Sequence, residues 1–298
     1  MKIGMVGHGE VGGIFAAGLQ SQAGVDGVSV WDLRLQDPAQ RDAARAKAQG
    51  QGVVAVESMQ ALCQASDLII SAVTASNTLA VAEEAARFIR PGTLFLDLNS
   101  ASPGTKQQAG AAIDAAGAHF VEAGVMTSVP PYGIRVPMLL GGAQAERLAA
   151  QLRDWGMDAK AVSERLGVAS AIKMSRSVMI KGLEALVIES YTNARAYGVE
   201  DHVLPTLMET FPSIDWSEQG AYFFSRVVQH GKRRAEEMRE AARTVQEAGF
   251  DPTMAAAIAV KHQWVSDQAR AGVFADLPPK ARWQDYADRL LAARPDQD

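Results

Sequence analysis

The chain has 298 residues, of which 48% are hydrophobic and 21% are charged, and its formal net charge is −5. This length allows two domains, and the composition is typical of a globular protein rather than a fibrous or disordered one. The negative net charge gives no reason to expect a nucleic acid or an anionic membrane surface as a partner. A single cysteine, Cys63, excludes an internal disulfide and a multi-cysteine metal site, and the five histidines lack metal-ligand spacing. The N-terminus lacks a basic and apolar leader, and no apolar run approaches the roughly eighteen residues of a membrane span, so we expect a cytoplasmic protein.

The first part of the chain carries a dinucleotide-binding fingerprint. An apolar run suited to a buried strand leads into Gly7-His8-Gly9-Glu10-Val11-Gly12, and residues with helical apolar spacing follow as far as Gln20. A second apolar run begins at Val28 and ends in Asp32, twenty positions after Gly12. This order of strand, G-x-G-x-x-G turn, helix, strand and acidic residue predicts a site for a dinucleotide.

Each glycine of the turn has a physical role in this interpretation. Gly7 allows the tight turn, Gly9 lets the backbone approach a pyrophosphate, and Gly12 lets the helix pack closely on the strand. The carboxylate of Asp32 would accept hydrogen bonds from an adenosine ribose and repel a 2′-phosphate, which favours NAD. Arg34 could offer that phosphate a guanidinium, so NADP stays possible.

Strands and helices then alternate along the chain. Further strands are expected at 53–56, 67–73, 93–97, 119–122 and 137–140, with helices at 37–48, 58–65, 78–90 and 103–117. This alternation predicts a Rossmann-type, doubly wound α/β sheet that binds its ligand at the carboxyl ends of the strands. Residues expected to bind the cofactor are Gly7, His8, Gly9, Glu10, Val11, Gly12, Asp32, Arg34, Val73, Thr74 and Asn99.

The strand pattern stops near Lys160, and the second half of the chain is predicted to be all-helical. Helices are expected at 167–197, 202–209, 220–249, 252–271 and 279–293. We therefore expect a dinucleotide-binding domain over 1–162 and a helical substrate and dimerisation domain over 163–298, beginning with a long interdomain helix.

The long helix carries a polar stripe on a largely apolar background. At about 100° per residue, a single stripe holds Lys173, Ser177, Glu184, Tyr191 and Arg195, and Lys181 lies beside it. A helix that is apolar on most sides is expected to be buried, and a lysine on it to be paired or functional. The alternative is a lysine whose stem lies along apolar surface while its amine reaches water.

Together these motifs resemble the β-hydroxyacid dehydrogenase family, which includes 6-phosphogluconate dehydrogenase and 3-hydroxyisobutyrate dehydrogenase. The glycine turn is the first similar motif, and Asp97 to Pro103 is similar to D-x-S-T-x-x-P. Phe120 to Ser128, followed by Leu139 to Gly142, is similar to the D-A-P-V-S-G-G segment and its next strand. Gly167 to Lys173 is similar to the motif that holds the family's catalytic lysine. The resemblance covers about residues 1–195 well.

Several positions depart from the family pattern. Asn99 stands at the family's serine, Ser100 at its threonine, and Ser177 at its asparagine, four residues after the lysine. Met126-Thr127-Ser128 replaces Ser-Gly-Gly, and Glu236-Glu237 occupies the region of a late Lys-Asp pair. These departures indicate a divergent subgroup with its own substrate.

The resemblance implies a nicotinamide-dependent oxidoreductase that passes hydride between the cofactor and the β-carbon of a small β-hydroxy carboxylate. Lys173 would be the general acid and base, with Ser177 as a second catalytic residue. The implied substrate-binding residues are Ser100, Met126, Thr127, Ser128 and Lys181. The alternatives are a non-catalytic redox sensor that binds NAD(P), and an imine reductase of the same fold.

The helical half contains further residues whose role has two interpretations. Glu236, Glu237 and Glu240 form i,i+3 and i,i+4 pairs with neighbouring arginines, as on an exposed helix face. Alternatively, His230 and Arg234 could bind an anion. Trp216 and the Phe223-Phe224 pair are expected in the core or at a dimer interface. The resembling family also implies a homodimer or a dimer of dimers.

Overall fold

The computed structural model describes residues 1–294, which form two compact units divided between Met174 and Ser175. The first unit contains an eight-stranded sheet with the strand order β3-β2-β1-β4-β5-β6-β7-β8. Its strands are β1 (Lys2–Val6), β2 (Gly27–Trp31), β3 (Val54–Ala55), β4 (Leu68–Ser71), β5 (Leu94–Asp97), β6 (His119–Val125), β7 (Met138–Gly141) and β8 (Ala159–Ser163). The sheet order runs outward in both directions from β1 and β4, so the topological switch point lies between these two strands. The doubly wound α/β class is confirmed.

Two features of the sheet differ from the sequence expectation. β7 runs antiparallel to β6, because their connection holds only the short 3₁₀ helix η3 (Gly133–Arg135) and no crossover helix. The expectation of seven strands was wrong, since β8 pairs with β7 as an eighth strand. β8 is an edge strand that is only partly buried, so its sequence Ala-Lys-Ala-Val-Ser lacks a strong apolar signal.

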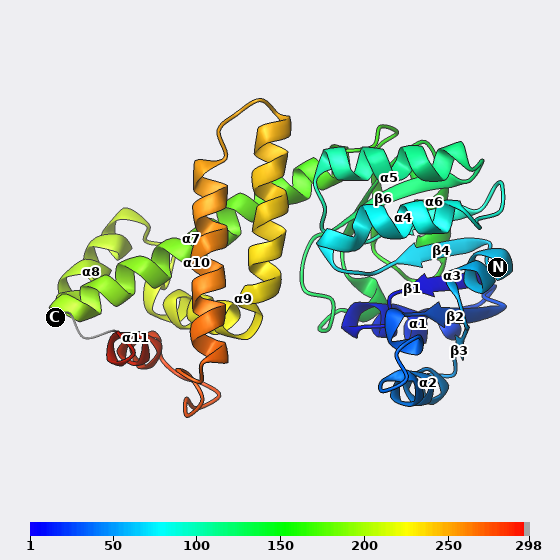
Figure 1. The fold of residues 1–298 in the computed structure, drawn as a ribbon. Coiled ribbons are helices and arrows are strands. Elements are labelled where there is room, and N and C mark those ends of the chain that lie inside the picture. The colour runs from blue at the N-terminus through cyan, green and yellow to red at the C-terminus, as the bar shows by residue number, and fades with distance from the viewer. Residues whose placement is uncertain (295–298) are drawn as a thin grey trace. The chain divides into compact units, whose positions relative to one another are not determined.

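Helices cover both faces of this sheet (Figure 1). They are α1 (Glu10–Gln20), α2 (Arg41–Gly50), α3 (Met59–Ala65), α4 (Thr78–Ala86), α5 (Pro103–Ala115) and α6 (Ala145–Asp154), with short 3₁₀ turns η1 (Leu33–Leu35) and η2 (Ala75–Asn77). The apolar cluster on one face includes side chains of α1 and α6, and the cluster on the other includes side chains of α3, α4 and α5. Successive strand residues alternate between the clusters, as pleating requires: Leu68 and Ile70 belong to one, and Ile69 to the other.

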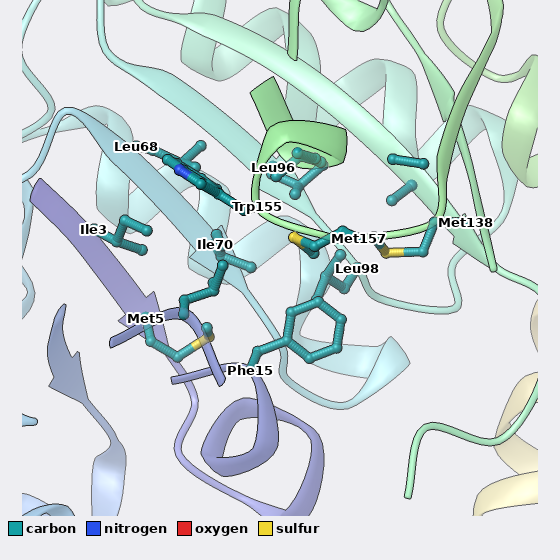
Figure 2. Close-up of a cluster of buried hydrophobic side chains, with 14 of the residues drawn as sticks. Ile3, Met5, Phe15, Leu68, Ile70, Leu96, Leu98, Met138, Trp155 and Met157 are labelled. Carbon is teal, nitrogen blue, oxygen red and sulfur yellow. The ribbon is translucent and has the colours of Figure 1, made fainter. Parts of the chain in front are cut away.

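One of these clusters is drawn in Figure 2. Phe15 of α1 lies beside Met5 of β1, and Trp155 and Met157 cover the middle of the sheet after α6. All four side chains are almost completely buried. This packing fixes the start of α1 against the carboxyl end of β1, where the glycine turn lies.

The second unit is all-helical. The thirty-residue helix α7 (Val168–Tyr197) begins in the first unit and continues into the second, which also contains α8 (Glu200–Thr210), α9 (Trp216–Glu247), α10 (Thr253–Arg270) and α11 (Trp283–Ala292). α9 and α10 lie side by side as a helical hairpin (Figure 1). Trp216, Phe223 and Phe224 are buried in the core of this unit, as predicted. Within residues 1–294, no helix is long and apolar enough to cross a membrane.

The apolar surface of α7 is less covered than the sequence suggests. Val187 and Ile188 are buried in the helical core, but Met179 is 66% exposed and Leu186 is 55% exposed. The expectation that the apolar first half of this helix is buried on most sides was therefore wrong for the isolated chain. The side chains of Ile172 and Ile180 are also exposed.

Candidate functional site

The glycine turn connects β1 to α1 in a conformation that depends on its glycines. Gly7 has φ +86°, a value that favours glycine, and a Cβ atom on Gly12 would lie 1.9 Å from the carbonyl oxygen of Gly7. A Cβ atom on Gly9 would have no atom within 4 Å, so the backbone is open at this point. α1 begins at Glu10 with Gly9 as its N-cap and has no side-chain cap. The open backbone and the uncapped helix start fit a phosphate group, which such N–H groups bind well.

Asp32 follows β2 and reaches the same turn. Its carboxylate accepts hydrogen bonds from the backbone N–H of His8 at 2.7 Å and from the guanidinium of Arg34 at 2.8 and 2.9 Å. Burial acts to raise the pKa of Asp32, but the hydrogen bonds from Arg34 and His8 outweigh it and hold the pKa well below its usual value. The structure thus brings Asp32 and Arg34, two predicted cofactor-binding residues, together at the glycine turn. The Arg34 guanidinium is bound to the Asp32 carboxylate.

Two residues in or just after α2, which were not predicted from the sequence, form hydrogen bonds with the glycine turn. The amine of Lys47 donates to the carbonyl oxygens of His8 and Gly9, each at 2.8 Å. Gln51 makes a 2.7 Å hydrogen bond with the imidazole of His8. Burial lowers the pKa of His8, only partly offset by the Gln51 contact. The i,i+4 spacing of Lys47 and Gln51 was the available signal, because it places both on one face of the helix.

Asn99 joins the carboxyl ends of two neighbouring strands. Its side-chain oxygen accepts from the backbone N–H of Val73 at 2.7 Å, and its side-chain nitrogen donates to the hydroxyl of Ser71 at 3.0 Å. The loop after β4, where Thr74 lies, is thereby tied to the loop after β5. Three predicted residues, Val73, Thr74 and Asn99, therefore lie together at the carboxyl edge of the sheet.

A buried ion pair, which was not predicted from the sequence, anchors the loop after β5. The amine of Lys106 lies 2.8 Å from the Asp97 carboxylate and also donates to the Asp97 carbonyl at 3.1 Å. Lys106 is 0% exposed and Asp97 is 1% exposed. Asp97 also accepts from the backbone N–H of Asn99 at 3.1 Å, so the pair connects the first turn of α5 to the strand end. Removal of either side chain would destabilise the fold, because it would leave the other charge buried without a partner.

Lys173 meets Ser100 at the end of this loop. The Lys173 amine donates to the hydroxyl oxygen of Ser100 at 2.5 Å, across 73 positions of sequence. Lys173 is partly buried, and both residues belong to the first unit. Met126, Thr127 and Ser128 follow the carboxyl end of β6, where the Met126 N–H continues the ladder to Pro137 at 2.9 Å.

The other predicted site residues belong to the second unit. The amine of Lys181 donates to the hydroxyl of Ser177 at 3.1 Å and forms an ion pair with Glu237 at 2.9 Å. Lys181 is 6% exposed and Ser177 is 7% exposed. A substrate group that reached Lys181 would therefore meet an amine that already has an acidic partner.

Arg234, which was considered as an anion-binding residue, forms an ion pair with Glu184. Its guanidinium makes two hydrogen bonds to the Glu184 carboxylate, and both side chains are buried. Burial raises the pKa of Glu184 and Arg234 only partly offsets this effect. The expected i,i+4 pairing is confirmed for Arg233 and Glu237, which lie 3.8 Å apart. The surface interpretation was wrong for Arg234 and Glu240, because both side chains are buried in the helical unit. Within the described part of the chain, no cluster of three or more histidine, cysteine or acidic residues could hold a metal ion.

The fold and the glycine turn define the N-terminal unit as a dinucleotide-binding domain of the oxidoreductase type. Residues 2–150 match the NAD-binding domain of 6-phosphogluconate dehydrogenase, and residues 194–265 match a domain of unknown function, DUF1932. The chain belongs to the 6-phosphogluconate dehydrogenase-like family, and its cofactor is NAD or NADP.

Solved structures of similar proteins support this assignment. A conserved hypothetical protein from Sinorhizobium meliloti 1021 is 36% identical, with a TM-score of 0.79 over 98% of this chain and 96% of that chain. The conserved protein MTH1747, described as structurally similar to 3-hydroxyacid dehydrogenases, is 31% identical, with a TM-score of 0.70 over 91% of this chain and 98% of that chain.

More distant structures share the fold alone. The 3-hydroxyisobutyrate dehydrogenase of Mycobacterium tuberculosis is 17% identical, with a TM-score of 0.67 over 98% of this chain and 99% of that chain. An imine reductase from Myxococcus stipitatus in complex with NADP⁺ is 20% identical, with a TM-score of 0.54 over 98% of this chain and all of that chain.

Proposed function

We propose that this protein is an NAD(P)-dependent dehydrogenase of small β-hydroxy carboxylates, with Lys173 as its general acid and base. The contact between Lys173 and Ser100 carries the proposal, because it brings a partly buried amine to the carboxyl edge of the sheet. Asn99, the neighbour of Ser100, accepts a hydrogen bond from Val73 in the loop after β4, and β4 lies next to β1, the strand that leads into the glycine turn. A proton-transferring group is thus next to the edge at which such sheets bind their ligands.

Each residue of this set has a proposed task. When bound, NAD(P) would supply or accept the hydride at the substrate's β-carbon. Lys173 removes the proton of the β-hydroxyl group in the oxidation direction and returns one in reduction, while Ser100 orients its amine. By the family resemblance, Ser177 is the proposed second catalytic residue, and Met126, Thr127, Ser128 and Lys181 are proposed substrate-binding residues. The structural similarity of MTH1747 to 3-hydroxyacid dehydrogenases supports the 3-hydroxyacid class.

Replacement of the proposed acid and base tests this role. Lys173→Met should reduce turnover at least about a hundredfold, since the proton would have no acceptor, while NADH binding is retained. Lys160→Met is the control, because Lys160 is an exposed residue of β8. Steady-state kinetics and NADH fluorescence titration measure the two effects. Near wild-type turnover in Lys173→Met would remove this residue from the mechanism.

We further propose that NAD is the preferred cofactor. The Asp32 carboxylate is held at the turn by the N–H of His8, and its lowered pKa keeps it charged at neutral pH. A negative charge at this position repels a 2′-phosphate. Fluorescence titrations with NADH and NADPH compare the two dissociation constants directly. Tighter NADPH binding would reverse the assignment and give Arg34 the role of phosphate ligand.

The substrate class is tested by a screen that follows nicotinamide absorbance. Hydroxy acids and aldehyde acids should react, whereas cyclic imines should not, because Lys173 is retained at the position of the family's catalytic lysine. Reduction of imines alone would favour the imine reductase alternative. Cofactor binding without turnover of any of these compounds would favour a redox sensor.

A further inference from the structure

Glu122 of β6 is a completely buried carboxylate whose partners all lie at the start of α7. One oxygen accepts from the backbone N–H of Gly167 at 2.8 Å and from that of Ala169 at 3.0 Å. The other oxygen accepts from the hydroxyl of Ser170 at 2.7 Å. Glu122 is 0% exposed. The N–H of Gly167, just before α7, and two donors of the first turn of α7 therefore satisfy a carboxylate that comes from the sheet.

This arrangement replaces a local helix cap. The first N–H groups of any helix lack partners within that helix, and a side chain at the N-cap position usually supplies one. The residue before α7 is Gly167, which has φ +98° and carries no side chain. Glu122 supplies the missing acceptor from 45 positions away, and its negative charge is stabilised by the helix dipole.

Close contacts remove the freedom of α7 to shift on β6. A Cβ atom on Gly124 would lie 2.9 Å from the carbonyl oxygen of Ala169 and 3.4 Å from the Cβ of Lys173. A Cβ atom on Gly141 would lie 2.6 Å from a carboxylate oxygen of Glu122. Glycines on β6 and β7 thus let the helix approach the sheet and give the Glu122 side chain its space.

Lys173 lies one helical turn after Ala169, on the same face of α7. Any rotation or sliding of the first turn would therefore move the Lys173 amine relative to Ser100, 2.5 Å away. We propose that Glu122 is a positioning residue for Lys173: by holding the first turn of α7 to β6, it sets the Lys173–Ser100 contact. The functional meaning of this role rests on the acid and base function proposed for Lys173, but the contact itself can be tested without a substrate.

The test measures the chemical reactivity of the Lys173 amine. Glu122→Gln preserves the size of the side chain but removes its negative charge, which weakens the hydrogen bonds from Gly167, Ala169 and Ser170 and the interaction with the dipole of α7. Competitive labelling of lysines with acetic anhydride over a range of pH, read by peptide mass spectrometry, gives the reactivity of each amine. We expect the Lys173 rate relative to the exposed Lys160 to change at least about threefold.

Two further variants control the experiment. Glu164→Gln makes the same chemical change at an exposed residue close to α7 and should leave Lys173 labelling unchanged. Ser170→Ala removes one of the three donors and should change Lys173 labelling in the same direction, by less than Glu122→Gln; it decides the question if Glu122→Gln does not fold. NADH binding should stay within about twofold of wild type in each folded variant, because the glycine turn is not altered.

Unchanged Lys173 labelling in folded Glu122→Gln, or in Ser170→Ala if the first variant does not fold, would overturn the positioning role. A lower unfolding temperature with unchanged labelling would make Glu122 a structural cap only. Failure of the proposed acid and base function would appear separately, as wild-type turnover in Lys173→Met.

Discussion

His262 lies on α10 with its imidazole fully buried beside an acidic side chain. Its Nε2 atom is 3.7 Å from a carboxylate oxygen of Glu184, which is already paired with Arg234. Burial lowers the pKa of His262 to about 3, and the positive charges of Arg234 and Lys181 act in the same direction. The imidazole is therefore neutral in the folded protein at neutral pH.

This residue gives the folded protein a specific dependence on pH. The unfolded chain binds a proton at His262 below pH 6.5, whereas the folded chain does so only near pH 3, so acid favours the unfolded state between these values. The His262 contribution is complete above pH 6.5 and falls by about 1.4 kcal/mol per pH unit as the pH decreases toward 3. Urea unfolding at pH 4, 5, 6 and 7 measures the slope.

Replacement of His262 measures how much this residue contributes to the pH dependence of the unfolding free energy. His262→Gln should reduce the slope of unfolding free energy between pH 4 and 6.5, and His202→Gln, at an exposed histidine of α8, should leave it unchanged. Equal slopes in the wild type and His262→Gln would mean that other groups carry the acid sensitivity.

At the scale of elements, two glycines of the turn between β1 and α1 have different roles: Gly12 is needed for folding, and Gly9 is proposed to be needed for cofactor binding. A methyl group on Gly12 would meet the backbone of Gly7, whereas one on Gly9 would meet nothing within 4 Å. Gly9 also has a negative φ of −70°, so an alanine there does not enter the left-handed region.

Two alanine variants test this difference. Gly9→Ala should unfold at the wild-type temperature but bind NADH at least about tenfold more weakly, because its methyl group occupies the space of the pyrophosphate. Gly12→Ala should lower the unfolding temperature as well, because α1 must move away from β1. Thermal unfolding and NADH fluorescence provide both readings. Wild-type NADH affinity in Gly9→Ala would contradict phosphate binding at this turn.

At the scale of the whole molecule, several large apolar side chains on α7 and α10 are exposed. Met179 and Leu186 of α7 are more than half exposed, and Val260 of α10 is 70% exposed. Packing against a second chain would remove this apolar surface from water. We propose a homodimer or a dimer of dimers that forms through the residues after about 165.

Light scattering tests the assembly. A dimer would have twice the chain mass of 31.7 kDa, or 63.4 kDa, and a dimer of dimers twice that again. Leu186→Lys should shift the mass toward 31.7 kDa, because it places a charge in the proposed interface, whereas Lys160→Met in the sheet unit should not. A mass of 31.7 kDa for the wild-type protein at micromolar concentration would contradict the proposal.

Sequence alone was sufficient for the features that depend on local pattern. The glycine fingerprint, the alternation of strands and helices, and the change to a helical second half are each defined by residues close together in the sequence. They can therefore be recognised without knowing the packing. The antiparallel β7 and the edge strand β8 were missed, because one depends on the path of a loop and the other has little apolar signal.

Only the tertiary structure decided which distant side chains meet. Lys173 reaches Ser100, Glu122 reaches the start of α7, and Lys106 reaches Asp97 inside the first unit. The sequence pattern suggested Lys173 as a candidate residue. It gave no indication that Lys173 contacts Ser100, or that Glu122 and Lys106 are buried and paired. These contacts depend on strand order, strand register and the rotation of each helix on the sheet, and a one-residue change in any of them would separate the atoms. The sequence therefore determined the fold class and the candidate lysine, and the packing of α7 on β6 determined the surroundings of that lysine.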